Sequence, residues 1–207
     1  MTEIIKKYFP HLTHRQEEQI AALDVLYHDW NAKINVVSRK DIDNLYEHHI
    51  LHSLAIARRI RFREGTNVLD FGTGGGFPGI PLAILFPESN FKLIDGTGKK
   101  VKVAKEVADS IGLDNVLPVH QRGEEEKGKF DFIVSRAVMP LPDLMKIVRK
   151  NIARDHHNAL PNGVIVLKGG NLDEELKPFR KIAERTELSQ WFDEAWFKEK
   201  YLVYVPV

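Results

Sequence analysis

Residues 68–80 read VLDFGTGGGFPGI, and this stretch decides which fold the sequence predicts. A short apolar run ends at Asp70, and a glycine-rich turn follows before a second apolar run begins. Gly74, Gly76 and Gly79 satisfy the pattern G-x-G-x-x-G, in which glycines let the backbone approach a ligand closely. The stretch therefore predicts a strand, a ligand-binding turn and a helix.

Further short apolar runs alternate with helical patterns along the rest of the chain. The runs read NVLDF, NFKLID, NVLPVH, FDFIVS and GVIVLK. Strands that alternate with helices are typical of βαβ units, so we predict an α/β fold with a mostly parallel sheet. The end of the chain, ELSQWFDEAWF and KYLVYVPV, predicts two strands with a tight link that close the sheet as an antiparallel hairpin.

Residues 1–64 lack this alternation and predict an N-terminal helical extension to a domain that spans residues 65–207. Thr13 and Gln16 have capping-box spacing at the start of one amphipathic pattern. A second helical pattern follows and is expected to end near Arg63, where the sequence EGTN indicates a turn.

Composition limits the classes of protein to which the chain can belong. Hydrophobic residues make up 43% of the 207 residues and charged residues 29%, and no apolar run is long enough to span a bilayer. The N-terminus lacks the pattern of a signal peptide, so we expect a cytoplasmic protein. The chain has no cysteine, which excludes disulfides and thiolate nucleophiles. Its net charge is only +1, so any nucleic acid must bind to local basic patches.

Two carboxylates beside the glycine turn suggest the ligand. Asp95 closes the strand after the turn, at the spacing expected of an acid that binds ribose hydroxyls. Asp70 would repel a pyrophosphate at the mouth of the turn, whereas the ammonium of a methionyl group would be attracted to it. The pair therefore favours S-adenosylmethionine over a dinucleotide. Two alternatives remain, namely that Asp70 is a helix cap and that the turn binds no ligand.

Two later segments are candidates for contacts with the adenine and with the methyl acceptor. The loop from Gln121 to Glu124 can present backbone amides to an adenine edge. The segment VSRAVMPL, which begins at residue 134, follows a strand at the place where the transferred group meets its acceptor. It contains neither a Pro-Pro-aromatic turn nor a cysteine, so the acceptor is expected to be nucleophilic without activation, such as a ring nitrogen.

The chain resembles a known family in several segments. The turn GTGGGFPGIPLAI, SRA at 135–137, LKGG at 167–170, and WNAKINVVSRKD with HHILHS upstream are similar to ribosomal RNA small subunit methyltransferase G, also called glucose-inhibited division protein B. The resemblance covers most of the chain. It implies a Rossmann-like class I S-adenosylmethionine-dependent methyltransferase fold, with a seven-stranded sheet and helices on both faces. It also implies methylation of N7 of one guanine in 16S rRNA, free or in a small-subunit particle.

The resemblance places cofactor contacts on Gly72, Phe77, the Gly123–Glu124 pair and Arg136. Together with the residues predicted from the motif, the expected cofactor-binding set is Asp70, Gly72, Gly74, Gly76, Phe77, Asp95, Gly123, Glu124 and Arg136. No residue is assigned a catalytic role, although Arg136 and Lys168 are candidates for positioning. The family pattern often has an acid where this chain has His52, which receives no catalytic role. It typically has alanine at the position of Gly123, a difference that we expect to be harmless.

Basic residues near the predicted site are candidates for RNA binding. They are Arg39, Lys40, Arg58, Arg59, Arg61, Arg63, Lys99, Lys100 and Lys168. The four arginines between residues 58 and 63 are the densest group, and their alternative interpretation is a solvated helix end. His48 and His52 have a spacing that can bind metal, but no third ligand is evident, so we expect no metal site. A small-molecule methyltransferase and a non-catalytic nucleotide-binding module remain alternative functions.

Overall fold

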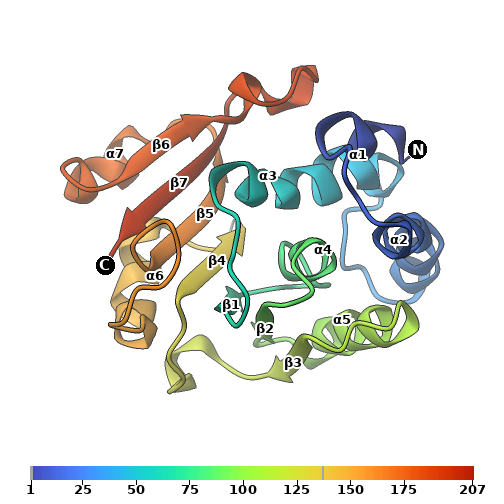
Figure 1. The fold of residues 1–207 in the computed structure, drawn as a ribbon, viewed down its shortest axis with the longest axis horizontal. Coiled ribbons are helices and arrows are strands. Elements are labelled where there is room, and N and C mark those ends of the chain that lie inside the picture. The colour runs from blue at the N-terminus through green and yellow to red at the C-terminus, as the bar shows by residue number, and fades with distance from the viewer. Residues whose placement is uncertain (1, 137) are drawn as a thin grey trace.

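The protein contains one seven-stranded sheet, and a computed structural model describes it for residues 2–136 and 138–207 (Figure 1). The strands are β1 (Asn67–Phe71), β2 (Asn90–Asp95), β3 (Val116–His120), β4 (Phe132–Arg136), β5 (Gly163–Gly169), β6 (Glu184–Glu187) and β7 (Lys200–Pro206). Their order is β3-β2-β1-β4-β5-β7-β6, with β1 to β5 parallel and β7 antiparallel to both neighbours. The order reverses between β1 and β4, and ligands bind at the carboxyl ends of strands beside such a point.

Helices cover both faces of the sheet, as predicted. One face packs against α1 (Glu3–Tyr8), α2 (His14–Lys33), the π-helix η2 (Leu45–Leu51), α3 (His52–Arg59), α4 (Gly79–Leu85) and α5 (Gly98–Ser110). The other face packs against α6 (Leu141–Val148) and α7 (Asp173–Leu176). Successive side chains of a strand point to opposite faces of the sheet. In β1, Val68 therefore packs into the core on the first face and Leu69 into the core on the second. None of the helices in the described ranges is both long and apolar enough to cross a membrane.

The N-terminal helices share the core of the sheet. The predicted capping box is confirmed, because the Thr13 side chain accepts from the backbone of Gln16 and the Gln16 side chain accepts from the backbone of Thr13. The buried Tyr27 of α2 donates its hydroxyl to the carbonyl of Gly75 at 2.8 Å, which ties the extension to the glycine turn. The second helical pattern ends at Arg59 rather than near Arg63, because the chain becomes extended at Ile60.

The C-terminal prediction is half right. An antiparallel pair does close the sheet, but its first strand is β6, and most of ELSQWFDEAWF forms the short 3-10 helices η6 (Leu188–Gln190) and η7 (Ala195–Phe197). The link is therefore long rather than tight. Leu188, Phe192 and Phe197 are almost fully buried at spacings of four and five residues, which a strand with alternating faces cannot provide.

Candidate functional site

The glycine-rich loop connects the end of β1 to the start of α4 and leaves little room for side chains. Gly72 has a φ of 69°, and a Cβ atom there would lie 2.5 Å from Cγ2 of Val138. Gly76 has a φ of 114°, and a Cβ atom there would lie 2.4 Å from Cδ1 of Ile80. Both positions combine a left-handed backbone with a close neighbour, so only glycine fits without movement.

Asp70 fastens this loop from inside the protein. Its side chain is fully buried, and Oδ2 accepts hydrogen bonds from the Thr73 hydroxyl at 2.6 Å and from the Gly79 backbone at 2.7 Å. Burial raises the pKa of this carboxyl to about 7, against the opposing effect of the hydrogen bonds from Thr73 and Gly79. The geometry gives Asp70 the capping role that the sequence left open, and direct contact between Asp70 and a cofactor stays a prediction.

A pocket of about 380 Å³ lies at the carboxyl ends of β1, β2 and β3. Asp95 forms part of its wall, where Oδ2 accepts from the Gly74 backbone at 2.9 Å and Oδ1 from the Thr97 backbone at 2.8 Å. A carboxylate has about four acceptor positions, so capacity remains for a ligand. The lining residues are Phe71, Gly72, Ile94, Asp95, Gly96, Thr97, Gln121, Arg122, Gly123, Glu124, Val138 and Met139.

The pocket brings together four of the nine predicted cofactor residues, Gly72, Asp95, Gly123 and Glu124. The remaining five, Asp70, Gly74, Gly76, Phe77 and Arg136, are not part of its lining. Gly74 lies directly behind it, since its backbone N–H is held by Asp95. The loop from Gln121 to Glu124 forms one wall of the pocket, and its contact with an adenine stays a prediction.

That glycine in place of the family's alanine at position 123 is harmless stays a prediction, but the reverse change meets an obstacle in this chain. A Cβ atom at Gly123 would lie 2.0 Å from Cε2 and 2.2 Å from Cζ of Phe71. Phe71 is 5% exposed and belongs to the core beneath α6, so its ring would have to shift within packed surroundings. Gly123 and Phe71 thus depend on each other, and a sequence motif that covers only one of them hides this dependence.

Arg136, at the end of β4, joins the pocket side of the sheet to the N-terminal helices. Its guanidinium donates to the carbonyl of His48 at 3.2 Å and contacts Nδ1 of His49 at 3.0 Å. It also lies over the ring of Phe77, 5.1 Å from the centroid. Burial lowers the pKa of Arg136 to about 10, which still leaves the group charged at neutral pH. Arg136 and Phe77 therefore form one stack behind the glycine loop.

His49 links Arg136 to a carboxylate from the extension. Burial, and then the charge of Arg136, lower the pKa of His49 to about 4, so the ring is neutral at pH 7. Since Nδ1 faces the donor Arg136, Nε2 carries the proton and donates to Oδ2 of Asp41 at 2.8 Å. Burial alone would raise the pKa of Asp41, but hydrogen bonds with His48 and His49 outweigh it and lower the pKa.

His52 lies in apolar surroundings behind this chain of contacts. Its ring packs edge-on against Trp196 and Phe197, with centroids 5.0 and 6.2 Å apart. Burial holds the pKa of His52 well below its usual value, so the ring is neutral. Its Nε2 atom is buried without a partner among the described residues. Within the two described ranges, no group of three or more potential metal ligands occurs.

Comparison with known proteins assigns the family. The model of the family described as rRNA small subunit methyltransferase G matches residues 16–193. A curated relative from Bacteroides fragilis, ribosomal RNA small subunit methyltransferase G, is 62% identical over 99% of this chain and 100% of its own length. A relative of the same name from Flavobacterium johnsoniae is 55% identical over 100% and 98%. The chain belongs to the rRNA small subunit methyltransferase G family.

Solved structures support the fold assignment of this family member. A SAM-dependent methyltransferase from Aquifex aeolicus matches 82% of this chain and 98% of its own, with a TM-score of 0.55 and 18% identity. An rRNA methylase from Streptococcus thermophilus matches 76% and 93%, with a TM-score of 0.51 and 11% identity. At these identities the likeness concerns the fold alone, and it confirms the predicted Rossmann-like class I methyltransferase fold.

The predicted RNA-binding residues of this family member are scattered over the molecule. Lys99 and Lys100 lie in the first turn of α5, directly after the pocket residues Gly96 and Thr97, and Arg39 with Lys40 lies on the exposed segment before η2. Lys168 is engaged inside the protein, because it forms an ion pair with Glu175 at 2.7 Å and donates to the Met139 carbonyl at 2.5 Å. Its side chain is 11% exposed, which leaves little of it for a phosphate.

Several residues of the site escaped the sequence analysis. Thr97, Val138 and Met139 line the pocket, and the last two fall in the VSRAVMPL segment that had been predicted to meet the acceptor. Ala137 of that segment lies outside the described residues. Asp41 and His49 received no role although they lie in the segments WNAKINVVSRKD and HHILHS, because the sequence does not show that His49 contacts Arg136, 87 residues later.

Proposed function

We propose that the protein transfers a methyl group from S-adenosylmethionine to N7 of one guanine in 16S rRNA. The observation that carries the proposal is the pocket at the carboxyl ends of β1, β2 and β3, with Asp95 on its wall, in a chain of the rRNA small subunit methyltransferase G family. The names of the relatives support the RNA substrate. The choice of guanine N7 rests on the resemblance described above and on the absence of cysteine.

The lining residues fit S-adenosylmethionine. Asp95 offers acceptor positions for the two ribose hydroxyls, and Gly123 with Glu124 forms the wall that would face the adenine. Arg122 is the single cation among the lining residues and is exposed, so the described pocket has no buried positive group for a pyrophosphate. When bound, S-adenosylmethionine would supply an electrophilic methyl group on a positively charged sulfonium.

The protein's own residues have little proton chemistry to do in this reaction. N7 of guanine carries no proton at neutral pH, so its lone pair can attack without a general base. His49, the buried histidine in contact with Arg136, has both ring nitrogens engaged and is neutral. It therefore orients Arg136 rather than accepting a proton. The protein contributes chiefly by alignment of the two reactants, which can lower the barrier by several kcal/mol.

Arg136 is proposed to bind the carboxylate of the methionyl group or an RNA phosphate. Its position over Phe77 and its contact with neutral His49 hold the guanidinium in one orientation. A cation directly beside the guanine would be unfavourable, because positive charge moves onto that ring as the methyl group is transferred. Arg136 thus belongs on the side of the anionic groups.

The proposal is tested with purified protein, labelled S-adenosylmethionine and two substrates, free 16S rRNA and small-subunit particles from cells that lack the gene. We expect label in N7-methylguanosine after nuclease digestion, at one position, from at least one of the two substrates. The same digest of cellular 16S rRNA should lack this nucleoside when the gene is deleted.

Other outcomes would contradict the proposal in recognisable ways. Label in a different nucleoside would overturn the assignment of guanine N7 as the acceptor, but the protein would still be an RNA methyltransferase. Binding of S-adenosylmethionine without transfer to either RNA substrate would favour a small-molecule acceptor or a non-catalytic module. No binding of S-adenosylmethionine by calorimetry would overturn the cofactor assignment itself.

A further inference from the structure

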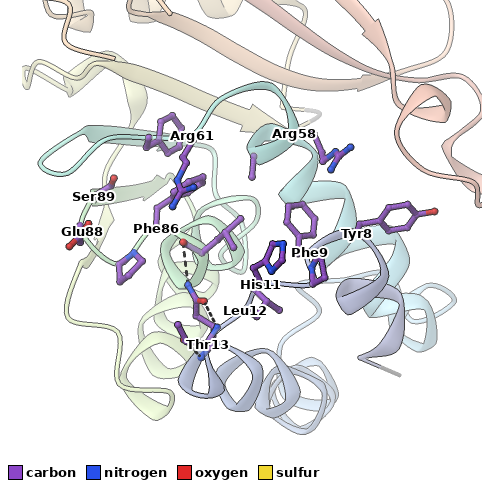
Figure 2. A pocket seen from close by; sticks show the side chains of 16 residues that line it. Tyr8, Phe9, His11, Leu12, Thr13, Arg58, Arg61, Phe86, Glu88 and Ser89 are labelled. Atoms are coloured by element: carbon purple, nitrogen blue, oxygen red, sulfur yellow. Dashed lines mark hydrogen bonds between the residues drawn. The ribbon is translucent and has the colours of Figure 1, made fainter. Parts of the chain in front are cut away.

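A second cleft, of about 640 Å³, opens at the opposite edge of the sheet from the cofactor pocket. Figure 2 shows the side chains that line it. It lies between the segment that joins α1 to α2, the end of α3 and the loop after α4. These elements precede β1 and β2, so the cleft borders the amino ends of those strands. Its lining comprises Tyr8–Thr13, Gln16, Ala57, Arg58, Arg61, Phe62 and Leu85–Ser89.

The four arginines between residues 58 and 63 form two pairs that differ in whether they contact other residues of the protein. Arg59 forms an ion pair with Glu184 and lies over the ring of Tyr204, and Arg63 donates to the carbonyl of His157 at 2.6 Å. Arg58 and Arg61 are exposed and line the cleft, and neither side chain has a hydrogen-bond or ion-pair partner in residues 2–136 and 138–207. The two arginines without protein partners are therefore the two that face the cleft.

Other groups in the cleft favour an anion with an attached ring. The 20-residue helix α2 begins beneath it, so the positive end of that helix adds to the charge of Arg58 and Arg61. The exposed His11 lies on the same wall, and Glu88 is the single acid of the lining. The half-buried Phe9 provides apolar surface, and aromatic side chains beside cations are typical of sites that bind nucleotides in single strands.

We infer that this cleft binds a phosphate of the RNA substrate at a nucleotide remote from the methylated base. The inference rests on the proposed function, because it names a contact of the same RNA. β1 has five residues, so the cleft and the cofactor pocket lie at least about 15 Å apart along the strand direction. A single nucleotide cannot occupy both sites, whereas a polynucleotide can contact both.

The charge distribution also favours RNA over a free nucleotide. The protein has a net charge of only +1, so attraction for RNA depends on cations that acids of the same chain do not neutralise. Arg58 and Arg61 meet this condition, whereas Arg59 and Lys168 are paired with Glu184 and Glu175. Arginine binds phosphate through two parallel N–H donors, which suits an exposed backbone contact.

The test compares two double variants with the same change in charge. In R58Q/R61Q the cleft loses its two cations, and in R59Q/R63Q the same stretch loses the two arginines that have protein partners. Affinity for 16S rRNA is measured by filter binding over a range of salt concentrations, and affinity for S-adenosylmethionine by calorimetry. Thermal unfolding of each variant shows whether it is folded.

We expect R58Q/R61Q to weaken RNA binding by about tenfold or more at low salt and to reduce the salt slope by about 1.4, the value for two phosphate contacts of a single strand. R59Q/R63Q should change both quantities much less, and cofactor affinity should be unchanged in both. The variant R58K/R61K should recover most of the slope but less of the affinity, because lysine keeps the charge without the paired donors.

Equal losses in the two double variants would overturn the inference in favour of general electrostatic attraction. Unchanged RNA binding in R58Q/R61Q would overturn it as well, and tight binding of 5′-AMP that this variant abolishes would then assign the cleft to a free nucleotide. If the wild-type protein neither binds nor methylates 16S rRNA, the proposed function fails together with the inference. If it methylates rRNA and the variants behave alike, the inference alone fails.

Discussion

The two edges of the sheet differ in how their polar groups are used. At the carboxyl ends of the strands, Asp70 and Asp95 accept four hydrogen bonds. Two come from Thr73 and Gly74 of the glycine loop, and the other two come from the first residue of α4 and from the residue before α5. At the amino ends, Arg58 and Arg61 have no partner among the described residues and face an open cleft. At the carboxyl ends, the donors and acceptors are therefore already held in position before a ligand binds. At the amino ends, the two arginines supply positive charge, but no hydrogen bond or ion pair within the described residues fixes their side chains.

This difference suggests a division of tasks between the edges. A small cofactor with defined hydroxyls and a ring needs acceptors at fixed positions, because a buried polar group left unpaired costs about 1–3 kcal/mol. A flexible polyanion needs positive charge at approximately the right place, since phosphate contacts carry affinity and register but little specificity. Substitutions at the carboxyl edge should therefore have large and local effects, and those at the amino edge smaller, salt-dependent ones.

The largest effect is expected for Asp95→Ala. This change removes the acceptor for the ribose hydroxyls and also frees the backbone N–H groups of Gly74 and Thr97, so affinity for S-adenosylmethionine should fall by about 1–3 kcal/mol. Calorimetry measures it directly. The matched control is Glu88→Ala, which removes an exposed acid from the other edge and should leave cofactor affinity unchanged. Equal affinity in the two variants would refute the ribose assignment.

An effect of similar size, on folding stability rather than on cofactor affinity, is expected for Gly123→Ala. The new methyl group would overlap the ring of Phe71, and forced repacking of this kind costs about 1–3 kcal/mol of folding stability. Gly96→Ala is the matched control in the same pocket, because a Cβ atom there has no neighbour within 4 Å. Urea unfolding compares the two.

The pair Gly123→Ala and Phe71→Val sharpens this test. Phe71→Val alone leaves a cavity, and Gly123→Ala alone creates a clash, so each single change should destabilise the protein. Together they should be less destabilising than the sum of the two, since the alanine methyl occupies space vacated by the ring. Strict additivity would show that the two positions do not share a contact.

Much of the fold was predictable because its signals are local. β1, β2 and β5 coincide with apolar runs of buried strands, and the Thr13 capping box is a four-residue pattern. The prediction for the C-terminal segment failed because Leu188 and Phe197 belong to 3-10 helices, Phe192 lies in the link between them, and all three are buried in the core. Aromatic residues in a short run do not reveal whether they alternate across a sheet or lie along a turn.

The candidate site divides in the same way. Asp95 could be placed from the spacing of a motif, and Gly72 from the family resemblance. The arginines at 58–63 were predicted as one cluster, because a sequence shows charge but not which charges have partners. The contacts of His49 with Arg136 and Asp41 join segments from the extension and from β4, so only the folded chain could bring them together.

The smallest effect, in fact none, is expected for the pH dependence of methyl transfer itself. Single-turnover rates with saturating RNA and cofactor should be flat between about pH 6.5 and 9, because N7 needs no general base. A titrating general base would instead make the rate rise with pH over part of this range. His49, with its pKa lowered to about 4, is already neutral throughout that window. Its contribution to folding stability is fully present above its usual pKa of 6.5 and is lost progressively as pH falls from there through about 4.

Asp70 provides the control for this prediction. Its raised pKa of about 7 means that its contribution to stability is present below the usual value of 3.8 and is lost as pH rises through about 7. Asp70→Asn should therefore flatten the pH dependence of unfolding over that range while the transfer rate stays flat in both proteins. A unit-slope rise in rate that His49→Gln abolishes would contradict the mechanism without a base. A break near pH 7 that Asp70→Asn removes would instead show that the charge of the glycine loop, rather than a base, governs the rate.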